Sequence, residues 1–130
     1  MKRRVVRLVG VYHATGTLWG ELSYWLKARV GRAHCALCSI THGSVREKAD
    51  WKRCRAEIPV PFVAVHLDER GPQLTAFTDG RTPCVVAETG TGLVMVVDAD
   101  RLEACDGSPA RLVRAIDTRA AELGLTLGDE

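Results

Sequence analysis

Two of the five cysteines and two of the four histidines lie within ten residues, in the stretch His34-Cys35-Ala36-Leu37-Cys38-Ser39-Ile40-Thr41-His42-Gly43. Thiolates three positions apart can hold one metal ion through a tight turn, and an imidazole can supply a further ligand. Cys35, Cys38 and His42 are spaced i, i+3 and i+7, so they share one face if the segment is helical. The stretch therefore predicts a transition-metal site with these three side chains as ligands.

A tetrahedral site needs a fourth ligand, and we expect His13 or His66 to supply it. Each of the two follows an apolar, strand-like run. The carboxyl ends of parallel strands border the functional crevice of an α/β sheet, so both histidines should lie at the same sheet edge. His34 is a weaker candidate, because it points elsewhere in a helical segment. We expect zinc as the metal, and copper or iron also suits mixed thiolate and imidazole ligands.

The same cysteines support two other interpretations. In a thiol-disulfide oxidoreductase, Cys35 would be the nucleophile and Cys38 the resolving thiol, because a CxxC motif lowers the pKa of its first thiol. The intervening Ala36-Leu37 differs from the Gly-Pro or Pro-His of familiar redox motifs. In the third interpretation the cysteines are simply two packed thiols. The partner is then a metal ion, a thiol or disulfide substrate, or neither.

Length and composition are those of one globular domain. The chain has 130 residues, a net charge of +2 and 26% charged residues, with no cluster of basic side chains that would indicate nucleic-acid binding. Its basic start is followed by an apolar run too short for a signal peptide, and no run is long enough to span a membrane. We therefore expect a cytoplasmic protein without nucleic-acid or membrane partners.

Cysteine usage agrees with that compartment. A stable disulfide framework is not expected in a reducing cytosol, which favours metal binding or redox chemistry for the CxxC. Cys54 and Cys105 each lie in a helical pattern among apolar neighbours, so we interpret them as small buried hydrophobes. Among nearby carboxylates, Glu21 or Asp68 could orient a histidine.

The elements that must position these residues follow from hydrophobic periodicity and capping signals. We expect strands at Val5–Tyr12 and Pro59–Leu67, parallel to each other and buried on both faces. A hairpin adds two more strands, so the fold class is α/β, a mixed sheet of about four strands with flanking helices. The remaining expected elements are helices at Leu18–Val30, from Ser44 to about Ala56, around Gln73–Phe77, from Asp98 or Asp100 to Cys105 and from Ser108 to Gly124, the hairpin strands Cys84–Glu88 and Leu93–Val97, and a frayed tail, Thr126–Glu130.

This order of elements resembles the thioredoxin-like superfamily: strand, helix, strand, then Thr82-Pro83 leading into a hairpin and a closing helix. The resemblance implies a cis peptide at Thr82-Pro83, at the same sheet end as His13. It also matches Cys35 and Cys38 to the family's CxxC, although here the motif follows the first helix instead of the first strand. Residues 1–130 are then a single thioredoxin-like α/β domain with a CxxC- and histidine-containing insertion at about 32–57.

Overall fold

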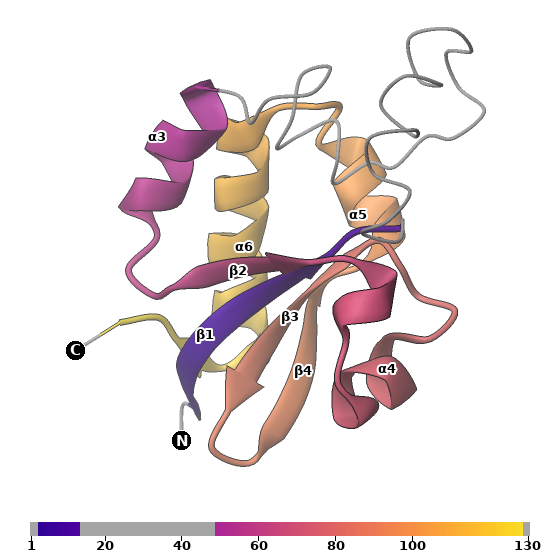
Figure 1. Cartoon of the computed structure of the whole chain (residues 1–130). Helices are drawn as coiled ribbons and strands as arrows, with labels where there is room; N and C mark the ends of the chain where they lie inside the picture. Colours follow the sequence, from indigo (N-terminus) through magenta and orange to yellow (C-terminus); the bar gives the residue numbers. More distant parts are fainter. Residues whose placement is uncertain (1–2, 14–48, 129–130) are drawn as a thin grey trace, which may run out of the picture.

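The computed structural model describes residues 3–13 and 49–128 of the chain (Figure 1). The expected helix at Leu18–Val30 and the expected start of a helix at Ser44 lie outside these residues. In chain order the described elements are β1 (Arg3–Val11), α3 (Ala49–Glu57), β2 (Phe62–Val65), the 3₁₀ helix η2 (Leu67–Glu69), α4 (Pro72–Thr78), β3 (Cys84–Thr89), β4 (Gly92–Val97), α5 (Ala99–Ala104), α6 (Pro109–Leu123) and β5 (Leu125–Thr126).

The sheet is mixed, with the strand order β2-β1-β3-β4. β1 pairs with β2 in parallel, with Val9 opposite Val63, and with β3 antiparallel. β3 and β4 are antiparallel neighbours joined by a tight turn. These pairings confirm the α/β class, the parallel first pair and the hairpin that the sequence predicts.

The end of the chain departs from expectation. Leu125–Thr126 forms a fifth strand, β5, which pairs in parallel with the start of β1. The turn into β5 is made by Gly124 at φ 69°, a left-handed conformation that glycine adopts at little cost. The backbone N–H of Arg3 donates to the carbonyl of Gly124 at 2.8 Å. Expecting fraying from Thr126 onward was therefore wrong at Thr126, because its backbone pairs with β1.

One side of the sheet, which we call the α6 face, carries the larger core. Leu8 of β1 and Val85 of β3 point to this side and are fully buried. α6 lies behind the sheet in Figure 1 and packs the stripe Leu112, Ile116 and Ala120 against it. α3 adds Trp51, which is 1% exposed and meets Phe62 edge-on with ring centroids 5.0 Å apart.

The opposite side, the α4 face, is covered less completely by the residues that the structure describes. Val9, Val11, Cys84 and Val86 form a smaller buried cluster there, against which the short helix α4 packs Leu74 and Phe77. The prediction that β1 and β2 are both buried on two faces was wrong: Val6 of β1 is 61% exposed, and Val63 and Ala64 of β2 are exposed. The physical reason for the exposure of β2 is that it is an edge strand in the described sheet, and α4 does not extend over all of it.

The helix boundaries follow from capping. Asp98 begins α5 by accepting the Arg101 backbone N–H at 2.9 Å, and Ser108 begins α6 by accepting that of Arg111 at 3.3 Å. Pro109 occupies the first turn of α6, where a backbone N–H has no partner within the helix, so the missing N–H of proline costs no hydrogen bond. None of the helices in the described ranges combines the length and the apolar character that crossing a membrane requires.

Candidate functional site

The candidate site lies where β1 and β2 end. The two strands are parallel, so Tyr12-His13 and His66 follow them at the same edge of the sheet, as the sequence predicts. The backbone N–H of Tyr12 donates to the Val65 carbonyl at 2.9 Å, which holds the two strand ends together. The rings of Tyr12 and His66 lie 5.2 Å apart between centroids.

His66 is oriented by a carboxylate three residues further along the chain. Its Nδ1 lies 2.6 Å from Oε1 of Glu69. An ionised carboxylate only accepts hydrogen bonds, so Nδ1 carries the hydrogen, and in the neutral ring the lone pair is on Nε2. Nε2 itself is buried. This is the arrangement by which carboxylates commonly fix the tautomer of a metal-binding histidine.

Glu69 is held from the other side as well. Its Oε1 also accepts the backbone N–H of His66 at 2.7 Å, which anchors the carboxylate at the start of η2. These two bonds, the backbone one foremost, lower the pKa of Glu69 below its ordinary value, while burial and the charge of Asp68 act in the opposite direction. Glu69 therefore remains ionised under mildly acidic conditions.

From the sequence, we expected Glu21 or Asp68 to be the carboxylate that orients a histidine. The described residues assign this contact to Glu69, and Glu21 lies outside them. A signal was present, because Glu69 follows His66 at the i, i+3 spacing that brings two side chains together over one helical turn.

Arg70 holds the loop that carries this pair. Its side chain is 10% exposed, and its guanidinium donates to the Leu67 carbonyl at 3.0 Å and to Thr78 Oγ1 at 3.1 Å. Thr78 is fully buried and donates to the Leu74 carbonyl at 2.6 Å. η2 is thereby tied to the far end of α4, which restricts where His66 and Glu69 can lie.

His13 meets a different partner. Its Nδ1 lies 2.8 Å from the hydroxyl of Thr82. The Thr82-Pro83 peptide is cis and leads into β3, whose first residue, Cys84, pairs with Val11. Both expectations for Thr82-Pro83, a cis peptide and a place at the sheet end of His13, are confirmed.

Four predicted ligands, Cys35, Cys38, His42 and the weaker candidate His34, lie outside the described residues. Of the other cysteines, Cys84 is fully buried, and burial raises the pKa of its thiol to about 12. Burial also raises the pKa of the Cys105 thiol. Cys105 is buried as expected, whereas Cys54 is only half-buried. The thiols of Cys84 and Cys105, which burial keeps protonated, are therefore poor nucleophiles and poor metal ligands at neutral pH.

The described part of the site can orient one imidazole strongly and a second more weakly. Within residues 3–13 and 49–128, no three histidine, cysteine or carboxylate side chains come together as a metal-binding group. A complete site at this edge would therefore need ligands from outside those ranges. Comparison of the chain with protein-family models, with curated proteins and with solved structures finds no match.

Proposed function

We propose that this chain binds a transition-metal ion, zinc in the first instance, at the edge of the sheet where β1 and β2 end. Three of the proposed ligands come from one stretch of the chain, residues 34–43: Cys35, Cys38 and His42. His66 is the proposed fourth ligand. The observation that carries the proposal is the 2.6 Å contact between His66 Nδ1 and Glu69 Oε1, because it directs the lone pair of the ring to Nε2.

His66 is preferred to His13 on chemical grounds. A carboxylate that accepts from Nδ1 fixes the ring with its lone pair on Nε2 and brings negative charge toward a cation bound there. Within the described ranges, His13 Nδ1 instead lies beside a neutral hydroxyl, that of Thr82, which brings no charge to the ring. His13 is the alternative fourth ligand.

Metal content tests this proposal directly. Protein purified under reducing conditions without chelator should hold about one zinc per chain by elemental analysis. Cys35→Ser and His42→Ala should lose the metal, and His66→Ala should lose it or bind it far more weakly, because each removes a ligand. Glu69→Gln should weaken zinc binding by about ten- to a hundredfold, measured by competition with a colorimetric chelator.

Cys54→Ser is the matched control, because it removes a partly exposed thiol of α3 that is not in the proposed ligand set. It should retain zinc fully. Wild-type protein without stoichiometric metal, or a Cys35→Ser variant that keeps it, would contradict the metal proposal. Loss of zinc in His13→Ala but not in His66→Ala would assign the fourth ligand to His13.

A second candidate function is thiol-disulfide exchange, on a fold that we propose to be thioredoxin-like. Its support is the strand order β2-β1-β3-β4 together with the contact between His13 and Thr82 at the start of the hairpin. The Cys35 thiolate would attack a substrate disulfide and release one substrate thiol. The Cys38 thiolate would then displace the second, leaving a Cys35–Cys38 disulfide that an external thiol reduces.

Trapping separates the two candidates. On the redox proposal, Cys38→Ser should accumulate a mixed disulfide with a model disulfide such as oxidised glutathione, and Cys35→Ser should not. His42→Ala should change the exchange rate only modestly, since histidine there tunes thiolate formation without taking part in the bond changes. Zinc-free protein that neither reduces the model disulfide nor forms the trapped species would exclude this second function.

A further inference from the structure

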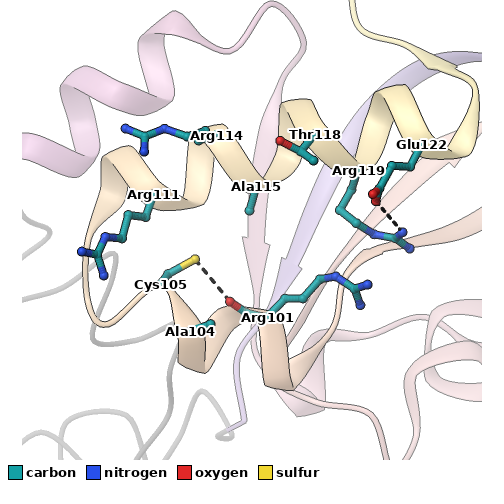
Figure 2. A pocket seen from close by; sticks show the side chains of 9 residues that line it. All are labelled: Arg101, Ala104, Cys105, Arg111, Arg114, Ala115, Thr118, Arg119 and Glu122. Carbon is teal, nitrogen blue, oxygen red and sulfur yellow. Dashed lines mark hydrogen bonds and ion pairs between the residues drawn. The ribbon is translucent and has the colours of Figure 1, made fainter.

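A pocket of about 480 Å³ lies between α5 and α6, on the side of these helices shown in Figure 2. The α6 side of the pocket is a stripe at helical spacing, from Arg111 through Ala115 and Arg119 to Glu122. The α5 side comes from Arg101 and the two residues that end the helix. Its size falls in the range of roughly 300–1,000 Å³ typical of small-molecule sites.

Four arginines line this pocket, and two of them already have partners. The Nη1 atom of Arg101 lies 2.7 Å from Oδ2 of Asp98. Arg119 donates to the Val96 carbonyl at 2.9 Å and pairs with Glu122 at 3.0 Å. These bonds fix two guanidinium groups at the wall of the pocket, and Figure 2 shows both at the end of the pocket nearer Glu122.

The other two arginines, Arg111 and Arg114, have uncompensated charge. Within residues 3–13 and 49–128, neither guanidinium has a hydrogen-bond or ion-pair partner. The first turn of α6 holds no acidic residue, although the partial positive charge of a helix start favours one there. Arg111 lies in this same turn. The pocket therefore concentrates positive charge that a bound anion would neutralise.

Apart from the polar Thr118, the rest of the lining is small and largely apolar. Ala104 and Ala115 contribute only methyl groups, and the Cys105 thiol donates to the Arg101 carbonyl with its sulfur at 3.4 Å. A ligand that fills this space must therefore combine anionic groups with an uncharged, flat or apolar body. Arginine suits both parts, because its planar guanidinium binds phosphate through two parallel hydrogen bonds and also stacks on aromatic rings.

We propose that the α5–α6 pocket binds a phosphorylated organic molecule of about nucleotide size. Arg111 and Arg114 hold the phosphates, and the alanine-lined wall receives the organic body. The pocket is made by other elements than the sheet edge, so this inference does not depend on metal binding or thiol exchange there.

Calorimetric titration of the full-length chain with ADP, inorganic pyrophosphate and adenosine tests the proposal. ADP should bind more tightly than either of the others, because each of those lacks one half of the proposed contacts. The double variant Arg111→Gln/Arg114→Gln should weaken ADP binding by about tenfold or more, as expected for the loss of charge-assisted bonds to phosphate. Both side chains are exposed, so the fold should be unaffected.

Arg81→Gln is the matched control, because it removes an exposed arginine that lies over Phe77 of α4, on the other face of the sheet. It should leave ADP binding within about twofold of wild type. If Arg81→Gln weakened ADP binding as much as the double variant, the proposal would be overturned, since ADP would then be attracted by the overall positive charge and not by the pocket. Three other results would also overturn the proposal. In the first, pyrophosphate binds as tightly as ADP, and in the second, ADP does not bind. In the third, a single-stranded oligonucleotide binds through Arg111 and Arg114 when ADP does not.

Discussion

Across residues 3–13 and 49–128, the two faces of the sheet differ in the elements that cover them and in the polar groups they carry. The α6 face is packed by α3, α5 and α6 around large buried side chains such as Leu102 and Leu112. The α4 face has a buried cluster of four residues, a short helix and a partly exposed edge strand. Its margin carries Glu69 and the Arg7–Glu88 ion pair. The α6 face therefore supplies most of the described apolar burial, while the α4 face leaves room for polar groups.

The largest effect that would test this comparison is the cost of deleting one leucine from each face. Leu112→Ala empties a fully buried position of α6, so we expect it to lower the free energy of unfolding by about 3–5 kcal/mol. Leu74→Ala on α4 should cost about 1–2 kcal/mol, because that side chain is only partly buried. Denaturant unfolding followed by circular dichroism measures both. Equal costs would show that the two faces are packed alike.

A smaller effect concerns Cys84, which is fully buried on the α4 face. The folded protein keeps this thiol protonated to about pH 12, whereas the thiol of an unfolded chain ionises near its ordinary pKa of 9.0. The pKa is raised on folding, so this contribution to stability is complete below about pH 9 and is lost as the pH rises from there toward 12. In the Cys84→Ala variant, the free energy of unfolding should therefore decrease less steeply between pH 9 and pH 12 than in the wild type. Denaturant unfolding at several pH values in this interval measures the difference.

Labelling offers an independent check on the same residue. In a Cys35→Ser/Cys38→Ser background, iodoacetamide should modify the half-buried Cys54 before Cys84 or Cys105. Rapid modification of Cys84 in the folded protein would mean that the α4 face opens readily at β3, and the view of this small cluster as a packed core would fail.

The smallest expected effect is at the margin of the α4 face. The pKa of Glu69 is lowered in the folded protein, so its contribution is present above the ordinary value of 4.5 and is lost as the pH falls through the lower folded value. In metal-free protein, Glu69→Gln should therefore reduce the acid sensitivity of unfolding slightly. The carboxylate is exposed and screened by water, so the change should be small. If the free energy of unfolding of Glu69→Gln fell with decreasing pH as it does in the wild type, the His66–Glu69 contact would not persist in solution.

The sequence by itself determined the local elements and much of their arrangement. A nearly continuous β-branched run marked β1, a hairpin pattern marked β3 and β4, and a 3.6-residue stripe between Ser108 and Gly124 marked α6. These patterns are read correctly because they depend on contacts along one element and on caps within a few residues. The place of His13 and His66 at one edge followed in turn from the parallel pairing of their strands.

Tertiary structure alone decided the features that depend on distant neighbours. The partial exposure of β2 depends on how far α4 extends over the sheet, and the pairing of Leu125–Thr126 depends on the chain end returning alongside the start of β1. The choice of Glu69 over Asp68 depends on the turn that η2 makes after His66. The arginine pocket depends on α5 lying beside α6. Burial and side-chain pairing arise between segments far apart in the chain, so no periodicity within one segment can encode them.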